Sequence, residues 1–359
     1  MNLQSYFKTQ SKITNATKER IKKINDKTNQ NNKIHSTFDT DFNFTNVFLQ
    51  NFDYLKEDNI NTTNKPKINP IINTINNVYQ PSFLNAHKTT GFGDFIRGCL
   101  YVLEFSDKFQ IKTEFHIKNH ILKKYLKYFH SKPEIDNIIS SNIEKFNDIN
   151  ANFNCKHNKI NYFIKQETEN KFIKYLNSCP IYKEHIFINT INFPLHYISL
   201  KNKQFMQNLL EPTDELKREI YYYMNSLKLK KQTFKVYHVR VGDYFLDNQE
   251  QTIIECNLLN KILNIIKIEP QCDYILITDS IIFKRLIMTF HKQLKCVYFD
   301  ISHTCENDVL TLKNTLIDFY IMSFASEIIS MSVYPHGSGF SKWCSVVYNI
   351  PYSCTYLPT

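Results

Sequence analysis

Short apolar runs alternate with amphipathic segments along the C-terminal part of the chain. The apolar runs predict strands at 234–240, 274–278, 296–299 and 327–332. The amphipathic segments predict helices at about 212–228, 251–267, 280–291 and 307–324, and a further helix that starts near Ser338. Apolar strands that alternate with helices of this length are typical of a parallel sheet that helices cover on both faces.

The N-terminal part of the chain shows the same alternation less clearly. The pattern predicts helices from Gly91 to about Lys108 and over 119–130, and strands over 112–117 and from His185 onward. The rest of 131–210 has no clear periodicity. We therefore predict a second α/β unit here and leave its detailed topology open.

These patterns divide the chain of 359 residues into three segments. Residues 1–80 are rich in Asn and Lys, and we interpret 1–40 as a flexible tail and 41–80 as a partly ordered wrapping segment. Residues 81–210 are the predicted N-terminal α/β domain. Residues 211–359 are the predicted C-terminal domain, with a Rossmann-like fold.

The net charge of +10 is concentrated in the tail, because residues 1–35 hold eight Lys and Arg against two acids. We expect no nucleic-acid partner, since duplex binding needs cations spread over a folded face. No run approaches the roughly 20 apolar residues of a membrane span, and the N-terminus has no signal-peptide core. Nine cysteines without CxxC spacing indicate free thiols in a reducing compartment, so we predict a cytoplasmic protein.

Candidate site residues follow the predicted strands, because ligands of doubly wound sheets bind outside the carboxyl ends of the strands. The first strand ends in His238-Val-Arg240-Val-Gly-Asp243. A guanidinium at this place can clamp a diphosphate through two hydrogen bonds, and an ion pair between Arg240 and Asp243 is the alternative. Asp279 follows the second strand, where it can contact a base or a ribose, or cap the next helix.

A turn of small residues, Ser338-Gly339-Phe340-Ser341, follows the last predicted strand. Small residues let backbone N–H groups approach a phosphate at a helix N-terminus. The alternative is a plain helix cap by Ser338 or Ser341. The turn lacks the Gly-Lys-Ser/Thr ending of a P-loop, so we do not expect ATP hydrolysis.

A glycine-rich segment, Gly91-Phe-Gly93-Asp94, opens the first predicted helix. It matches the dinucleotide fingerprint GxGxxG imperfectly, because Ile96 stands at the sixth position and the next glycine is Gly98. The segment marks a tight turn that enters a helix and is weak evidence for NAD. No acidic metal-binding pair precedes a strand turn, and Cys155 and His157 lack partners at zinc-site spacing, so we expect no metal.

Four of these segments resemble motifs of one enzyme family. His238-Val-Arg-Val-Gly-Asp-Tyr244 resembles the HxRRGDY motif of the α-1,2-fucosyltransferases and of the broader fucosyltransferase superfamily. Tyr274-Ile-Leu-Ile-Thr-Asp279 resembles the second motif, and 318–343 resembles the third, in which a helix, a strand and a Ser-x-Phe-Ser turn follow in order. Gly91-Phe-Gly-Asp94 stands where the family has Gly-x-Gly-Asn. The resemblance spans about 87–352, with the motifs in the family's order.

The chain departs from the family pattern at two positions. Val241 stands where the family has its second Arg, and Asp94 stands where Asn is commoner. The first departure puts the linkage class in doubt more than nucleotide-sugar binding, because the first Arg is present as Arg240.

The resemblance implies a GT-B fold, in which two Rossmann-like domains face each other across a cleft. It implies an inverting, metal-independent transfer of fucose from GDP-fucose to a glycan, with no cofactor besides this donor. Arg240 and the turn at 338–341 would stabilise the leaving GDP, and Asp279 would contact guanine or ribose. His238 and Asp243 would orient the loop, with Asp243 as a candidate base.

On the same resemblance, Gly91 and Gly93 would line the donor site, and the acceptor would lie against the N-terminal domain near them. A transferase for another GDP-sugar, a non-catalytic relative that binds glycans or nucleotides, and an unrelated α/β binding protein stay open as alternatives. The sequence leaves the acceptor, the linkage and the oligomeric state undetermined.

Overall fold

The computed structural model describes ten stretches of the chain, all of which belong to one compact unit that begins at Thr45. The described residues are 68, 71–79, 91–129, 133–139, 142–146, 158–180, 184–194, 198–242, 256–301 and 309–358. The predicted flexible tail lies outside them, as does Asp243.

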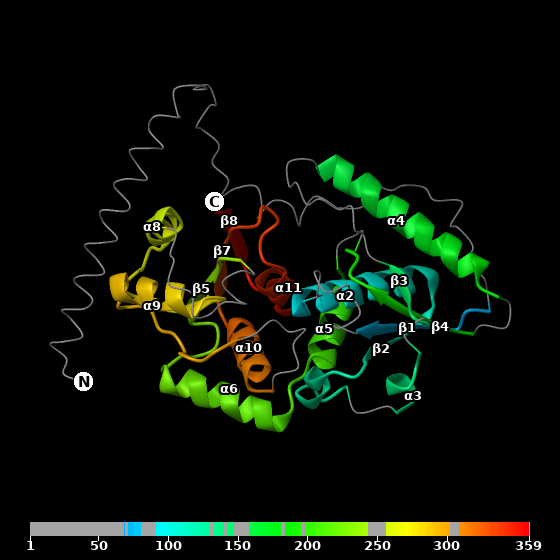
Figure 1. The fold of residues 1–359 in the computed structure, drawn as a ribbon, viewed down its shortest axis with the longest axis horizontal. Coiled ribbons are helices and arrows are strands. Elements are labelled where there is room, and N and C mark those ends of the chain that lie inside the picture. The colour runs from blue at the N-terminus through cyan, green and yellow to red at the C-terminus, as the bar shows by residue number, and fades with distance from the viewer. Residues whose placement is uncertain are drawn as a thin grey trace, which may run out of the picture. The chain divides into compact units, whose positions relative to one another are not determined.

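The N-terminal half is built on a parallel sheet of four strands in the order β2-β1-β4-β3 (Figure 1). The strands are β1 (Thr74–Tyr79), β2 (Lys112–Ile117), β3 (Glu144–Phe146) and β4 (His185–Thr190). The structure confirms the predicted strands at 112–117 and from His185. The predicted start of this half at residue 81 is too late, because β1 lies at the centre of its sheet.

The helices of this half are α2 (Phe92–Phe109), η4 (Ile121–Lys124), α3 (Pro133–Asp136), α4 (Asn158–Ser178) and α5 (Leu200–Leu209). The helix predicted from Gly91 is α2. The helix predicted over 119–130 is wrong, since only the short η4 forms there. Asn119 has a left-handed φ of 45°, and the imidazole of His120 caps Leu122 N–H at 3.2 Å. Leu126 then forms an isolated antiparallel β-bridge with Pro212, so no helix continues beyond η4.

The C-terminal half contains a second parallel sheet, in the order β6-β5-β7-β8. Its strands are β5 (Phe234–Arg240), β6 (Asp273–Thr278), β7 (Glu327–Ser332) and β8 (Tyr352–Tyr356). Two parallel sheets with crossover helices confirm the predicted α/β class with two Rossmann-like units. The strand order reverses at β5. Strand β6 lies on one side of β5, and β7 and β8 lie on the other side.

The predicted strand at 296–299 does not form. Only an isolated bridge is present, in which the backbone of Lys295 makes two hydrogen bonds with β6. Beyond this bridge the carbonyl of Val297 accepts from the ammonium of Lys284 at 2.9 Å. The Lys284 side chain thus supplies the hydrogen bond that the backbone of a neighbouring strand would otherwise donate. Strand β8, which follows the last helix, was not predicted from the sequence.

Helices cover both faces of the second sheet. They are α6 (Asp214–Ser226), α8 (Cys256–Ile265), α9 (Ile281–Phe290), α10 (Val309–Met322) and α11 (Gly339–Tyr348). Apolar side chains of α8 and α9 form one buried cluster with one face of the sheet, and α10 and α11 pack on the other. Thr213 and Ser280 cap α6 and α9 through their side-chain oxygens, which satisfies backbone donors at both helix starts.

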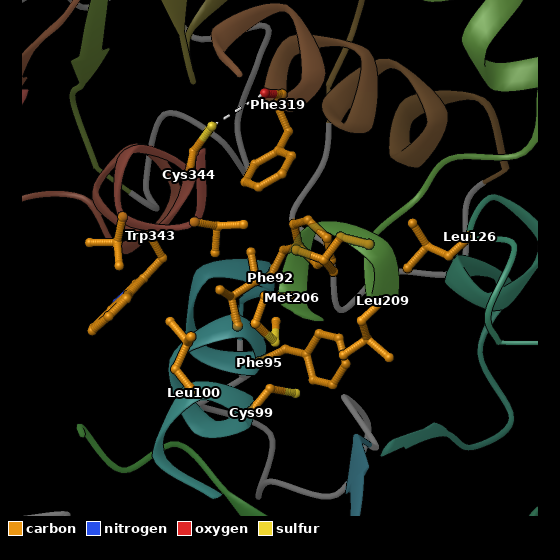
Figure 2. Close-up of a cluster of buried hydrophobic side chains, with 14 of the residues drawn as sticks. Phe92, Phe95, Cys99, Leu100, Leu126, Met206, Leu209, Phe319, Trp343 and Cys344 are labelled. Carbon is orange, nitrogen blue, oxygen red and sulfur yellow. Dashed lines mark hydrogen bonds between the residues drawn. The ribbon is translucent and has the colours of Figure 1, made fainter. Parts of the chain in front are cut away.

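A continuous apolar core joins the two halves around α2 (Figure 2). Phe92 of α2 packs edge-on against Phe319 of α10, with ring centroids 4.9 Å apart. Met206 and Leu209 of α5 belong to the same buried cluster. Helix α2 is therefore buried on most of its faces, and its first turn is held against the C-terminal half.

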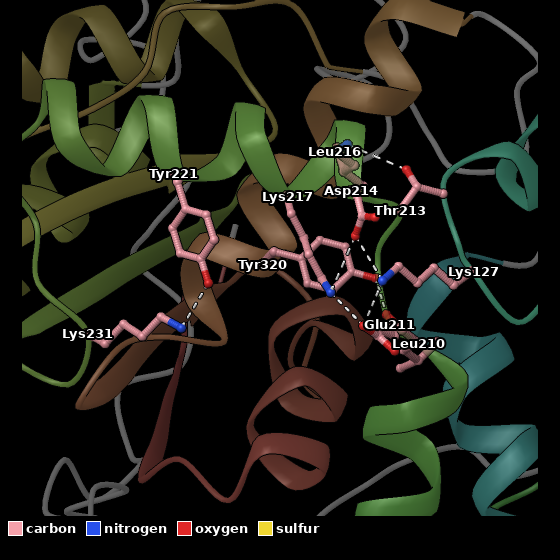
Figure 3. Close-up of polar contacts among 10 residues, drawn as sticks. All are labelled: Lys127, Leu210, Glu211, Thr213, Asp214, Leu216, Lys217, Tyr221, Lys231 and Tyr320. Carbon is pink, nitrogen blue, oxygen red and sulfur yellow. Dashed lines mark hydrogen bonds and ion pairs between the residues drawn. The ribbon is translucent and has the colours of Figure 1, made fainter.

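The connection between α5 and α6 is tied to both halves (Figure 3). Lys127 N–H donates to the Glu211 carbonyl at 2.8 Å, and Thr213 N–H donates to the Tyr125 carbonyl at 2.8 Å. The hydroxyl of Tyr320, on α10, donates to the Leu210 carbonyl. These hydrogen bonds, of which the one from Tyr320 is buried, give the connection a defined course.

Candidate functional site

Arg240 ends β5 at the point where the strand order reverses, which is where doubly wound sheets bind their ligands. Its guanidinium Nη1 donates to Asp279 Oδ2 at 2.8 Å, and the two side chains are 15% and 5% exposed. The guanidinium also lies 5.9 Å from the ring of Tyr334. Arg240 is thus held at the carboxyl end of β5 by the carboxylate of Asp279, which follows the neighbouring strand β6.

Asp279 is occupied by the loop that follows β5. Its Oδ1 accepts from Val241 N–H at 2.8 Å, and its Oδ2 accepts from Gly242 N–H at 3.0 Å as well as from Arg240. Burial raises the pKa of Asp279, and the charge of Arg240 and the backbone donors oppose that rise. This arrangement argues against the predicted contact to guanine or ribose, since both oxygens already serve as acceptors. It makes Asp279 a positioning residue for Arg240.

The loop after Arg240 turns sharply at Gly242, whose φ of +118° is a conformation that side chains rarely adopt. Val241 lies in the apolar cluster under α8 and α9, at 4% exposure. Its side chain therefore packs into the core, and its backbone N–H serves Asp279. Asp243, the candidate base, lies outside the described residues.

His238 lies in the middle of the sheet and is buried. Its Nδ1 lies 3.5 Å from the hydroxyl of Ser330, its register partner on β7. Burial, assisted by the charge of Arg240, lowers the pKa of His238 to about 3. A neutral imidazole with so low a pKa is a weak base, so the geometry favours the predicted orienting role over proton transfer.

The turn Ser338-Gly339-Phe340-Ser341 begins α11 beside the end of β7. Ser341 donates to the hydroxyl of Ser330 at 3.4 Å, which anchors the first turn of the helix on the sheet. Phe340 lies between His238 and Phe319, with ring centroids 6.0 and 5.4 Å away. Ser338 makes no side-chain capping bond, so neither serine caps the helix in the way the plain alternative required.

The glycine-rich start of α2 meets the start of α11. A Cβ atom built on Gly93 would lie 2.4 Å from the carbonyl carbon of Gly339 and 2.7 Å from Phe340 N. A Cβ on Gly339 would meet only Trp343 and Gly93, at 3.8 and 4.0 Å. The position that needs glycine so that α2 and α11 can approach each other is therefore Gly93. The predicted approach of a phosphate to the turn at 338–341 stays a prediction. Two helix N-termini converge here, and both favour an anion.

Gly91 and Gly98 have separate local roles in α2. Gly91 N–H donates to the Asp94 carboxylate at 3.1 Å, which closes the first turn of the helix. A Cβ on Gly98 would lie 1.8 Å from the Thr190 carbonyl oxygen. Gly98 thus allows α2 to pack against the end of β4. The glycine spacing noted in the sequence serves helix packing here.

Sequence reasoning missed a buried carboxyl group on α10 and a buried lysine on α9. Asp318 of α10 is 3% exposed and its Oδ2 has no hydrogen-bond partner. Burial raises the pKa of Asp318 to about 6, and the charge of Lys284 opposes that rise. Lys284, in the first turn of α9, is itself buried. The available signal was a lone Asp inside the apolar helix pattern, within the segment that resembles the third motif.

Together these residues can hold an anion. Arg240 supplies a fixed guanidinium, and the first-turn amides of α2 and α11 supply oriented N–H dipoles a short distance away. Such preorganised groups stabilise negative charge on a leaving group without reorganising during the reaction. The described residues contain no cluster of three or more His, Cys, Asp or Glu side chains placed to share a metal ion. None of the helices described has the length and apolarity that crossing a membrane requires.

No protein-family model and no curated protein matches the chain. Solved structures with a similar fold include several fucosyltransferases. NodZ α-1,6-fucosyltransferase soaked with GDP-fucose has 11% identity and a TM-score of 0.45, with 77% of this chain and 92% of that chain covered. An Arabidopsis thaliana FUT1 mutant with GDP has 9% identity and a TM-score of 0.48, covering 88% and 76%. POFUT1 without ligand has 10% identity and a TM-score of 0.43, covering 81% and 99%. No residue role is carried over from these similarities.

Proposed function

We propose that the protein is a glycosyltransferase that moves fucose from GDP-fucose to a hydroxyl group of a glycan. The observation that carries the proposal is Arg240, fixed by Asp279 at the switch point of a Rossmann-like sheet, beside the turn at 338–341. An anionic leaving group at a strand end needs this kind of fixed cation and these oriented amides. The donor comes from the motif resemblance. The described residues of the four motifs lie on α2, β5, β6, α10, β7 and α11 or in the loops beside them.

The finer assignment is the galactoside α-1,2 type, with inversion at the anomeric carbon and no metal. It rests on the His-x-Arg-x-Gly-Asp pattern at 238–243. The acceptor would lie against the N-terminal half, near Gly91 and Gly93. We place the protein in the cytoplasm, and buried free thiols such as Cys99 and Cys344 agree with a reducing compartment.

Val241 favours a second candidate, a relative that binds a GDP-sugar and turns it over slowly or not at all. A valine in the core cannot provide the second guanidinium of the family motif. Tight GDP binding without fucose release would identify this case, as would turnover of a different GDP-sugar.

The direct test is GDP binding by titration calorimetry to wild type, Arg240→Lys and Arg240→Ala. Lysine keeps the charge but loses the planar fork, so we expect GDP affinity to fall at least roughly tenfold in Arg240→Lys and further in Arg240→Ala. Arg285→Ala is the matched control, because Arg285 is exposed on α9. Wild-type GDP affinity in Arg240→Ala would place the diphosphate elsewhere and overturn the proposal.

Turnover distinguishes the finer claims. GDP-fucose, GDP-mannose, UDP-galactose and ADP-glucose are offered with a galactoside acceptor, with and without EDTA. We expect release of GDP from GDP-fucose alone, unaffected by EDTA. Loss of activity with EDTA and recovery with Mn²⁺ would contradict the metal-independent mechanism.

A further inference from the structure

The end of β5 offers a single arginine among the described residues. Val241 packs into the apolar cluster under α8 and α9, so the position after Arg240 contributes no charge. A diphosphate carries two to three negative charges, and binding sites for it usually combine several donors and cations. Positive charge from another element would complete the site.

Arg97 of α2 is held rigidly at the junction of the two halves. Its Nη2 lies 3.0 Å from Asp94 Oδ1, one helical turn earlier. Its guanidinium stacks on the ring of Phe193 at 4.1 Å, and that ring lies 5.5 Å from Trp343 of α11. The side chain is 10% exposed. A guanidinium fixed in this way loses little conformational freedom on binding an anion.

The place of α2 brings Arg97 toward the same loop that Arg240 faces. Gly93, one turn before Arg97, touches the backbone of Gly339. On the other side, Arg240 lies by the ring of Tyr334, which stacks on His336 at 5.5 Å. The loop from Tyr334 to Ser338 therefore connects the residues beside Arg240 to the start of α11, which packs against the first turn of α2.

The electrostatics of His336 agree with this placement. Partial burial lowers the pKa of His336, and so do the charges of Lys342, Arg97 and Arg240, while Asp94 opposes them. One imidazole thus lies within range of cations from α2, β5 and α11. Among the described residues, these three cations lie with the carboxylates of Asp94 and Asp279 near two helix N-termini. An anion would neutralise the positive charge that these two carboxylates do not balance.

We propose that Arg97 is a second diphosphate-binding residue, which supplies from α2 the cation that the strand end lacks. The inference rests on the proposed function, since it assigns a residue to the same nucleotide site. It also gives Asp94 a role. Asp94 orients Arg97 and attenuates its charge, so the pair sets how strongly the N-terminal half holds the nucleotide.

The test measures GDP, inorganic pyrophosphate and guanosine binding to the full-length wild type, Arg97→Met and Arg240→Ala. Methionine keeps the apolar packing on Phe193 and removes the charge. We expect GDP and pyrophosphate affinity to fall roughly tenfold to a hundredfold in Arg97→Met, with guanosine affinity unchanged. Arg285→Met, at an exposed position on α9, is the matched control. Equal loss for guanosine would show a structural role and contradict the inference.

Asp94→Asn gives an independent readout if Arg97→Met folds poorly. Asparagine keeps an oxygen acceptor for Gly91 N–H but removes the negative charge beside Arg97. GDP should then bind a few-fold more tightly, whereas a purely structural pair predicts weaker binding, which would overturn the inference. Wild type without GDP affinity would refute the proposed function. A wild type that binds GDP, together with an Arg97→Met that binds it equally well, would refute the role of Arg97 alone.

Discussion

The two halves of the molecule use the same topology with different chemistry in their sheets. In the C-terminal sheet most of the buried side chains are apolar, Val236 and Ile275 among them, and His238 and Ser330 form a polar contact. In the N-terminal sheet the central strand carries Asn76 and Asn77, both buried. Asn76 donates to the Ile186 carbonyl at 3.3 Å, and its oxygen lies 3.0 Å from His116 Nε2. The C-terminal sheet is thus stabilised mainly by apolar burial, whereas the central strand of the N-terminal sheet depends more on pairs of polar side chains.

Because of this difference, we expect the two sheets to respond differently to substitutions. Apolar side chains tolerate changes of similar volume, so the C-terminal sheet can vary while it keeps its strand-end residues in place. Buried amides require their partners, because an unpaired polar group in the core is costly. The N-terminal half therefore depends on particular pairs, and each prediction below tests that contrast.

The largest effect is expected from glycine substitutions in the two helices that meet. In Gly98→Ala the new Cβ would overlap the Thr190 carbonyl oxygen of β4, so the free energy of unfolding should fall by about 3 kcal/mol or more. Gly339→Ala, whose Cβ meets nothing closer than 3.8 Å, should change stability little. Urea denaturation measures both. Equal stability losses would show that the close approach lies elsewhere.

A second effect concerns the pH dependence of the C-terminal half. Burial raises the pKa of Asp318 to about 6, above its unfolded value. The stability that this group contributes is fully present below the unfolded pKa and is lost as the pH rises through about 6. Asn cannot titrate, so the stability of Asp318→Asn relative to wild type should increase between pH 4 and pH 7.5, by up to about 3 kcal/mol. Denaturation curves across this window measure it, and a constant difference would contradict it.

The polar pair of the N-terminal sheet predicts a smaller, non-additive effect. Asn76→Ala leaves His116 without the amide oxygen and should cost roughly 1–3 kcal/mol. The double variant Asn76→Ala/His116→Ala should cost less than the sum of the two single changes, because no partner is left unpaired. A double-mutant cycle measures the coupling. Additive losses would mean that Asn76 and His116 do not stabilise the sheet as a pair.

The smallest effect is expected at the connection between the halves. Lys127 pairs with Glu211 and Asp214 at 3.1 and 2.8 Å, but this cluster is open to solvent. Exposed ion pairs contribute little, so Lys127→Ala should leave the melting temperature nearly unchanged. Tyr320→Phe removes the buried bond to the Leu210 carbonyl and should cost about 1 kcal/mol. A larger loss in Lys127→Ala than in Tyr320→Phe would reverse this order.

The contrast between the sheets also explains which elements could be predicted. Strand β5 and strand β7 were predicted at their observed bounds, because buried parallel strands are nearly continuous apolar runs. Strand β1, with its two asparagines, does not resemble such a run. Its amides are satisfied by β4 and β2, which are distant in sequence. Local pattern cannot show that, and so the start of the N-terminal half was placed too late.

The sequence by itself determined the alternation of strands and helices in the C-terminal half. It also located the strand ends where chemistry is expected, Arg240 and the turn at 338–341 among them. Tertiary structure decided what each of these residues contacts. Asp279 holds Arg240 in place, and Gly93 is the position at which α2 and α11 approach each other closely. Periodicity along the chain reports which face of an element is buried, whereas partners are set by crossover connections that bring distant segments together.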